Sequence, residues 1–140
     1  MAELDWKQIK VEVTRLLQEL ISLDTTNPPG NEAIAAQYVA DVLSREGIDA
    51  QVLEGYPGRG NVVAELVGST DAPPLILLSH LDVVPAEAEE WEHPPLSGTL
   101  SGDYVWGRGA VDTKNLTAME MIVMLLLKSQ GEIHLYRYRK

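Results

Sequence analysis

Residues 75–78 form a continuously apolar run that ends directly in Ser79-His80-Leu81-Asp82. A strand that is apolar on both faces must be covered on both sides, whereas a strand with one wet face alternates apolar and polar residues. The run therefore predicts a central strand of a sheet. It favours an α/β architecture in which helices cover the sheet.

Three segments repeat apolar residues at the i, i+3, i+4 spacing of a helix with one buried face. The first spans residues 5–23, and the second spans residues 34–47, where Gly47 suits a left-handed C-terminal cap. The third runs from residue 113 to about residue 129, with Gly131 closing it. It is the most apolar of the three, so we expect it to be deeply packed.

The remaining segments have the period of strands or no period. Residues 48–52 alternate and residues 61–67 are rich in β-branched side chains, so the link between them at 55–60 predicts a hairpin. Residues 104–106 are a short strand candidate, and residues 83–103 predict a long irregular connection. The sequence thus predicts a mixed, mainly parallel sheet between helices, with an antiparallel hairpin at one edge.

Length and composition exclude several classes of protein. The 140 residues suit one domain, and the net charge of −10 argues against a nucleic-acid partner. No apolar run approaches the roughly 18 residues of a membrane span, and the acidic N-terminus is unlike a signal peptide, so the expected location is the cytoplasm. With no cysteine, any metal must be held by His, Asp or Glu.

His80 and Asp82 follow the apolar run at the end of the predicted strand, where ligands of such sheets bind. Side chains at i and i+2 of a strand point to the same side, so the Asp82 carboxylate is placed to orient the His80 imidazole. The other ring nitrogen is then free to bind a metal. The alternative is a histidine whose hydrogen bonds are simply satisfied at a strand end.

Asp112 follows a glycine-rich turn and precedes the third helix. It is a candidate metal ligand, but taken without context the position favours the N-cap of that helix, a role that Thr113 could also fill. Gly107 and Gly109 lie between a predicted strand and a predicted helix, which is also typical of a dinucleotide-binding site. A carboxylate at position 112 would repel the pyrophosphate, so we disfavour that site.

Other charged and aromatic positions are predicted to be surface features. We expect Lys114 to be a solvated lysine of the first helical turn, and His93 and His134 to be surface residues. An acidic cluster next to Trp91 is predicted to be a wet loop; its members are Glu87, Glu89, Glu90 and Glu92.

Three blocks of sequence, in this order and spacing, resemble the dizinc amidohydrolases, which include acetylornithine deacetylase, succinyl-diaminopimelate desuccinylase, aminoacylase and glutamate carboxypeptidase. The blocks are residues 77–85, LLSHLDVVP; residues 91–103, with Trp91 and PPLSG; and residues 106–114, WGRGAVDTK. Residues 22–32, SLDTTNPPGNE, are similar as well. The resemblance covers about residues 5–130.

The resemblance implies a phosphorylase/hydrolase-like zinc exopeptidase catalytic domain in truncated form. It makes His80 a ligand of one zinc, Asp112 the carboxylate that bridges two zincs, and Asp82 the catalytic acid that orients His80. Cobalt is an alternative metal. The implied activity is hydrolysis of amide bonds in N-acyl amino acids or small peptides, and the implied partner is such a small substrate, with a homodimer as a further option.

The family's Glu-Glu pair, its later ligands and its small domain have no counterpart in this sequence. Residues 1–131 are therefore expected to be the N-terminal part of a metallohydrolase catalytic domain, and residues 132–140 an atypical basic tail. Two classes of function stay open. The chain is either part of a zinc-dependent enzyme, with the isolated chain inactive, or a non-catalytic α/β fragment that acts as an interaction or self-associating module.

Overall fold

The structure is a computed structural model that describes residues 4–69 and 73–131. Its elements, in chain order, are α1 (Trp6–Ser22), α2 (Glu32–Arg45), β1 (Asp49–Tyr56), β2 (Arg59–Glu65), the short 3-10 helix η1 (Ala88–Glu90), β3 (Thr99–Ser101), β4 (Tyr104–Trp106) and α3 (Lys114–Gln130). The predictions for His134 and the basic tail lie outside the described residues.

Helix α1 forms where the apolar periodicity predicts it. Its N-cap is Asp5, whose carboxylate accepts hydrogen bonds from the backbone nitrogens of Lys7 and Gln8 at 3.0 and 3.1 Å. The cap satisfies amide groups that have no partner inside the helix. Leu16 and Leu20 are fully buried on the inner face of the helix.

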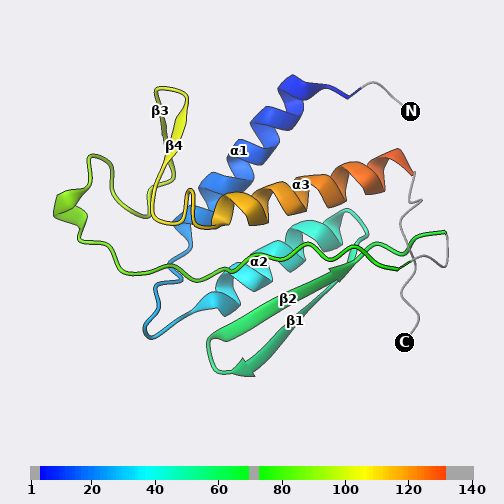
Figure 1. The fold of residues 1–140 in the computed structure, drawn as a ribbon, viewed down its shortest axis with the longest axis horizontal. Coiled ribbons are helices and arrows are strands. Elements are labelled where there is room, and N and C mark those ends of the chain that lie inside the picture. Colours follow the sequence, from blue (N-terminus) through cyan, green and yellow to red (C-terminus); the bar gives the residue numbers. More distant parts are fainter. Residues whose placement is uncertain (1–3, 70–72, 132–140) are drawn as a thin grey trace.

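Helix α2 and the β1–β2 hairpin form the lower layers of the molecule (Figure 1). The helix ends at Arg45, and Gly47 has the positive φ of 71° that a left-handed turn requires. The hairpin is antiparallel, with Val52 opposite Val62, and it packs on α2. Both the second helix and the hairpin of the sequence analysis are confirmed.

Helix α3 lies against α1 and also touches α2, so the three helices enclose the main core (Figure 1). The helix ends at Gly131 in the left-handed conformation with φ of 65°, as predicted. The core is a cluster of buried apolar side chains from all three helices and from the residue directly before β1: Leu16, Leu20, Val39, Leu43, Ile48, Ala118 and Met121. The predicted deep packing of the third helix holds for one face of its first half, where Lys114, Thr117, Ala118 and Met121 are buried, whereas Leu116, Met119 and Val123 are exposed.

The predicted mainly parallel sheet is not present within residues 4–69 and 73–131, which contain two separate antiparallel hairpins, β1–β2 and β3–β4. Residues 75–78 are not a covered central strand. They belong to no strand, and Leu75, Ile76 and Leu78 are 72%, 76% and 84% exposed. A central strand needs a hydrogen-bonded neighbour on each side. Here a cavity of about 340 Å³ separates residues 77–82 from β2, so no ladder forms.

Two backbone hydrogen bonds fix the end of this extended segment. The Val83 nitrogen donates to the Thr25 oxygen at 3.1 Å, and the Asn27 nitrogen donates to the Val83 oxygen at 2.8 Å. They form a single parallel bridge between Thr26 and Val83. The loop after α1 therefore holds the residues that follow His80.

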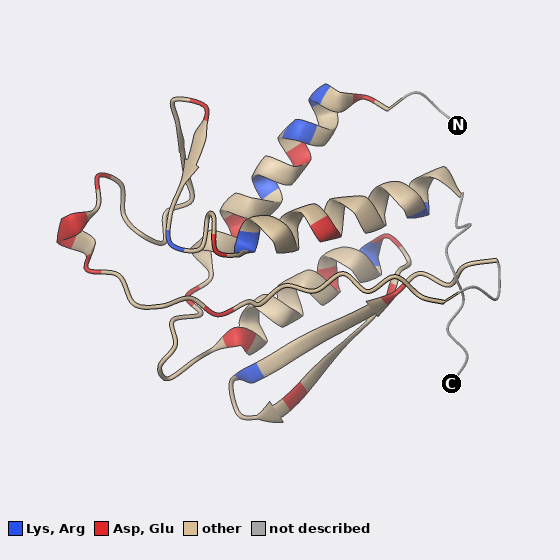
Figure 2. Cartoon of the chain, in the orientation of Figure 1, with Lys and Arg blue, Asp and Glu red and all other residues tan. Residues whose placement is uncertain are grey.

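The predicted irregular connection, residues 83–103, is largely irregular but contains η1 and strand β3. The sequence analysis missed β3, which pairs with the predicted strand β4 in a three-residue ladder too short to show a period. The acidic cluster is exposed around η1, at the left edge of Figure 2. This agrees with the predicted wet loop.

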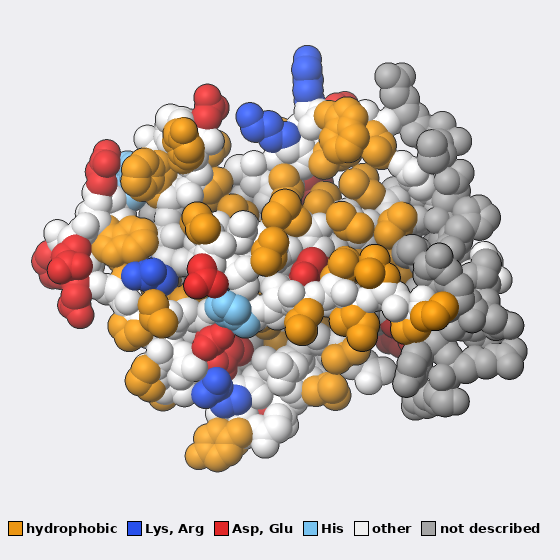
Figure 3. Space-filling view, viewed as in Figure 1, with side chains coloured by type: hydrophobic (Ala, Val, Ile, Leu, Met, Phe, Trp, Pro, Cys, Tyr) orange, Lys and Arg blue, Asp and Glu red, His pale blue; other side chains and the backbone are white. Residues whose placement is uncertain are grey.

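Apolar side chains gather across the middle of the face shown in Figure 3, over α3 and the extended segment. In the described part of the chain, no helix combines the length and the apolar character needed to cross a membrane.

Candidate metal centre

The imidazole of His80 lies between two carboxylates. Its Nδ1 atom is 3.0 Å from the backbone oxygen of Asp82 and 3.1 Å from Oδ1 of the same residue. On the other side, Nε2 is 3.0 Å from Oδ1 of Asp112. Three side chains that are separated by up to 32 positions in the sequence therefore meet at one point.

The contacts of the His80 ring bear on where it carries its hydrogen. The oxygens that face Nδ1 and Nε2 can all only accept, so a protonated ring donates on both sides, and we assign the hydrogen of the neutral ring to Nδ1 because two oxygens of Asp82 face that atom. The lone pair of Nε2 then faces a carboxylate oxygen of Asp112, which is repulsive unless a proton or a metal cation lies between them. Burial lowers the pKa of His80, but hydrogen bonding to Asp112 and Asp82 and their negative charges outweigh it, and the pKa is raised.

Asp82 is held from its other side by Asn27. The Asn27 Nδ2 atom donates to Oδ2 of Asp82 at 2.9 Å, and this bond lowers the pKa of the Asp82 carboxyl group. Both carboxylate oxygens of Asp82 are thus engaged, one by His80 and one by Asn27. Asp82 is placed to orient the ring of His80, and Asn27 is a contributor that the sequence analysis did not identify.

Asp112 lies on the turn that precedes α3, and its side chain is 87% exposed. The N-cap of α3 is Thr113, so the alternative interpretation of Asp112 as the N-cap is wrong. The turn is close-packed at Gly109, where an added Cβ atom would lie 2.8 Å from Cγ1 of Val83. The Asp112 carboxylate is therefore presented outward from a tightly packed turn.

A metal ion would fit between His80 and Asp112. Imidazole nitrogen and carboxylate oxygen are preferred zinc ligands, and two such atoms on one tetrahedral zinc lie about 3.4 Å apart. The observed 3.0 Å between Nε2 and Oδ1 needs only a small opening to reach that span. Among the described residues, however, no group of three or more His, Asp or Glu side chains could hold a metal ion. The donors present are part of a coordination sphere.

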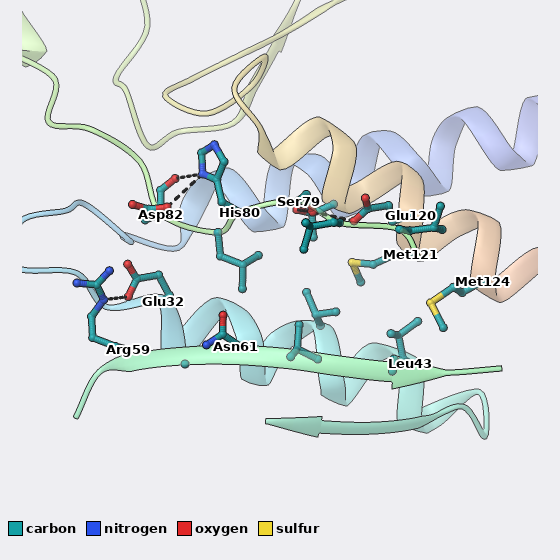
Figure 4. Close-up of a pocket in the computed structure, with 18 residues that line it drawn as sticks. Glu32, Leu43, Arg59, Asn61, Ser79, His80, Asp82, Glu120, Met121 and Met124 are labelled. Carbon is teal, nitrogen blue, oxygen red and sulfur yellow. Dashed lines mark hydrogen bonds and ion pairs between the residues drawn. The ribbon is translucent and has the colours of Figure 1, made fainter. Parts of the chain in front are cut away.

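The site borders two cavities. The first, of about 340 Å³, lies between the extended segment, β2 and α3; Figure 4 shows His80 and Asp82 at one end of it, near Glu32 and Arg59. The second, of about 380 Å³, is lined by His80, Asp82, Asp112 and the glycine-rich turn. In this second cavity the Arg108 guanidinium lies 5.1 Å from the ring centre of Trp91.

Lys114 is not a solvated lysine as predicted. It is completely buried, and its Nζ atom donates to the backbone oxygens of Leu20 and Leu23, both at 2.8 Å. Burial lowers its pKa to about 8. The prediction failed because the acceptors are the carbonyl groups at the end of α1, which no local sequence pattern reveals.

His93, predicted to be a surface residue, is half-buried. Its ring packs edge-on against Trp106, with ring centres 5.1 Å apart.

Comparison with known proteins identifies the family of this chain. The sequence model of peptidase family M20/M25/M40 matches residues 76–136 of this chain. The chain is 36% identical over 122 residues to N-formyl-4-amino-5-aminomethyl-2-methylpyrimidine deformylase of Halalkalibacterium halodurans. The matched region is 84% of this chain and 29% of that protein. It is 32% identical over 123 residues to a probable succinyl-diaminopimelate desuccinylase of Staphylococcus aureus, covering 87% and 29%.

A solved structure has the same fold. The chain superimposes on an M20 family metallo-carboxypeptidase from Sulfolobus solfataricus with a TM-score of 0.76 and 23% identity, over 86% of this chain and 28% of that one. The chain spans about 29% of the length of the curated relatives it matches. Over that span it is a member of peptidase family M20/M25/M40.

Proposed function

We propose that this chain is part of a zinc-dependent hydrolase of amide bonds, in which His80 and Asp112 are metal ligands and Asp82 orients His80. The observation that carries the proposal is the position of His80 between two carboxylates, with Nδ1 on Asp82 and Nε2 on Asp112. A histidine that ligates zinc through one nitrogen commonly donates its other N–H group to a carboxylate or a backbone carbonyl. Nδ1 of His80 faces both kinds of acceptor, the backbone oxygen and the carboxylate of Asp82.

The three side chains have distinct roles in this proposal. Asp82 keeps the hydrogen on Nδ1 and leaves the Nε2 lone pair for the metal. Asp112 supplies an exposed carboxylate that can reach a metal without desolvation of a buried charge. When bound, zinc polarises an amide carbonyl and lowers the pKa of its water to about 7. Two zinc ions bridged by Asp112, with cobalt as an alternative, are the arrangement that the family resemblance implies.

The names of two relatives support a substrate class. A deformylase and a desuccinylase are both named for the removal of an acyl group. We therefore propose that the full-length enzyme acts on N-acyl amino acids or small peptides, and that the substrate reaches the metal through the cavity of about 380 Å³ beside Asp112.

The 140-residue chain alone is proposed to be inactive. Catalytic zinc usually takes three protein ligands, and the part of the chain that the structure describes brings only His80 and Asp112 together as donors for it. General-base catalysis contributes typically 10²–10⁴-fold, and among residues 4–69 and 73–131 the carboxylate nearest in sequence to His80, that of Asp82, is already engaged by His80 and Asn27.

The test is a titration of the chain with Co²⁺, followed by its visible absorption, with His80→Ala and Asp112→Ala as variants. The proposal expects weak binding with nitrogen and oxygen ligands that either variant abolishes. The matched control is His93→Ala, which removes a histidine that packs against Trp106 in the wall of the second cavity and is not one of the proposed ligands. Equal binding by all four chains would overturn the metal site.

A second candidate function is favoured by one observation. The apolar side chains of Leu75, Ile76 and Leu78 are exposed on an extended segment that has no partner strand among the described residues. Exposed apolar patches and unpaired strand edges promote association. A non-catalytic, self-associating module would keep this association and lack metal binding, which distinguishes it from the enzyme.

A further inference from the structure

Lys114 connects the beginning of α3 to the end of α1. Its ammonium group donates to Leu20, in the last turn of α1, and to Leu23, the C-cap of that helix. Carbonyl groups at a helix C-terminus have no partner inside the helix, and a cation there is favourable. A lysine with no exposed surface is rare unless it is paired, and here the pairing fixes the two helix ends to each other.

The same end of α1 also holds the segment that carries His80. The Thr25 hydroxyl donates to the Leu81 oxygen at 2.6 Å, and the two backbone bonds of Val83 flank Thr26. Residues 20–27 are therefore a common support. His80 is attached to it through Leu81 and Val83, and Asp112 is attached through Lys114.

The stem of Lys114 lies directly under the turn that presents Asp112. An added Cβ atom on Gly109 would lie 3.2 and 3.3 Å from the Cδ and Cγ atoms of Lys114. The Lys114 backbone nitrogen also donates to the Gly109 oxygen at 2.9 Å, which closes the turn. The Lys114 side chain therefore lies between the turn that carries Gly109 and the end of α1, and its length bears on the distance between them.

We propose that Lys114 is a positioning residue that sets the distance between Nε2 of His80 and the carboxylate of Asp112. The inference rests on the proposed function, because this distance is the span that a metal ion must bridge. A lysine that only stabilises the fold would affect folding and leave this distance unchanged, so the two roles are separable.

The experiment uses side chains of graded length at position 114. The chain has no cysteine, so Lys114→Cys can be alkylated selectively while unfolded. A 2-aminoethyl group recreates the length and charge of lysine, and a 3-aminopropyl group is one methylene longer with the same ammonium. Lys114→Met keeps most of the volume and removes the donors. Ile48→Ala, at a buried position directly before β1, is the control for loss of stability alone.

Crystal structures and Co²⁺ titrations of the folded chains give the readouts. We expect Lys114→Met and the 3-aminopropyl chain to separate Nε2 and the Asp112 carboxylate beyond about 3.5 Å, the limit of a hydrogen bond. We expect Co²⁺ affinity to fall by about 10–100-fold, as when a group that orients a metal ligand is lost. The 2-aminoethyl chain should restore both values, and Ile48→Ala should change neither.

The result that overturns the inference is an unchanged His80–Asp112 distance in both altered chains. If Lys114→Met does not fold, the comparison of the 2-aminoethyl and 3-aminopropyl chains decides, because both retain the ammonium group. If the unaltered chain binds no Co²⁺, the proposed metal site fails, while the distances in the crystal structures still decide the role of Lys114.

Discussion

The side-chain nitrogen of Asn27 lies 2.9 Å from Oδ2 of Asp82, across 55 positions of the sequence. Because Oδ1 of Asp82 faces His80, this bond leaves the carboxylate with one partner on each oxygen. The arrangement favours an orienting role for Asp82 over direct metal binding.

Replacing Asp82 with Asn places an amide between two hydrogen-bond donors, Asn27 Nδ2 and His80 Nδ1. The amide has one acceptor oxygen for the two, so either Asn27 loses its partner or His80 Nδ1 keeps only the backbone oxygen of residue 82. We expect metal affinity of the chain to fall by about 10–100-fold, and the fold to persist because Asp82 is only partly buried. Isothermal titration with Zn²⁺ and circular dichroism check the two expectations. Asp41→Asn, on the exposed side of α2, is the matched control, and unchanged affinity in Asp82→Asn would contradict the role.

The charge of Asp112 is expected to hold the pKa of His80 above its ordinary value, since hydrogen bonding to that carboxylate favours the protonated ring. Asp112→Asn should therefore lower the His80 pKa. Two-dimensional ¹H–¹⁵N NMR of the ring nitrogens, followed through a pH titration, gives the value in both chains. Since a proton and a metal compete for Nε2, metal affinity should rise as the pH is raised through the His80 pKa. An Asp112→Asn chain with an unshifted His80 pKa would show that the contact is not formed in solution.

Gly109 and Gly102 make a matched pair of backbone positions. Both have positive φ, 86° and 58°, but a Cβ atom on Gly109 would lie 2.8 Å from Val83, whereas nothing lies within 4 Å of one on Gly102. Gly102→Ala should cost about 1–2 kcal/mol of the free energy of unfolding, from the left-handed backbone alone. Gly109→Ala should cost about 1–3 kcal/mol more, from overpacking. Urea denaturation measures both, and equal costs would show that the turn relaxes freely.

The exposed apolar segment is expected to make the chain self-associate. Lysine at both Ile76 and Leu78 adds two charges to the segment and should shift the chain towards monomer. Sedimentation velocity over a range of protein concentrations measures the change. A control pair, Val11→Lys and Leu53→Lys, adds the same charge at exposed apolar positions on α1 and β1. A parent chain that is monomeric at every concentration would refute the self-associating module.

Local patterns in the sequence predicted the elements that depend on local interactions. The three helices, the β1–β2 hairpin and the left-handed glycines Gly47 and Gly131 are confirmed, because their periods and caps are set by residues close in sequence. Strand β3 was missed and the central strand was wrong, since pairing depends on distant partners. The apolar run at 75–78 indicates that both faces of the segment favour burial. It does not reveal whether another strand lies beside the segment to form hydrogen bonds with it.

For the candidate site, the sequence indicated the side chains but not what holds them in place. His80, Asp82 and Asp112 were named from their positions after predicted strands and from family blocks, and the structure brings them together. Their metal roles remain predictions. Asn27 and Lys114 were missed because each acts on a residue or carbonyl that is more than 50 positions away in the chain.

The single parallel bridge between Thr26 and Val83 has a consequence for how the chain tolerates changes of length. The bridge lies three residues after His80, so it anchors the alignment of that histidine against Asp112 from its C-terminal side. A slip of two residues would carry His80 about 6.6 Å along the chain, out of reach of the carboxylate. Insertions or deletions N-terminal to Ser79 leave the spacing between His80 and the Thr26–Val83 bridge unchanged. A single residue inserted between His80 and Val83 changes that spacing and would move the His80 ring away from Asp112.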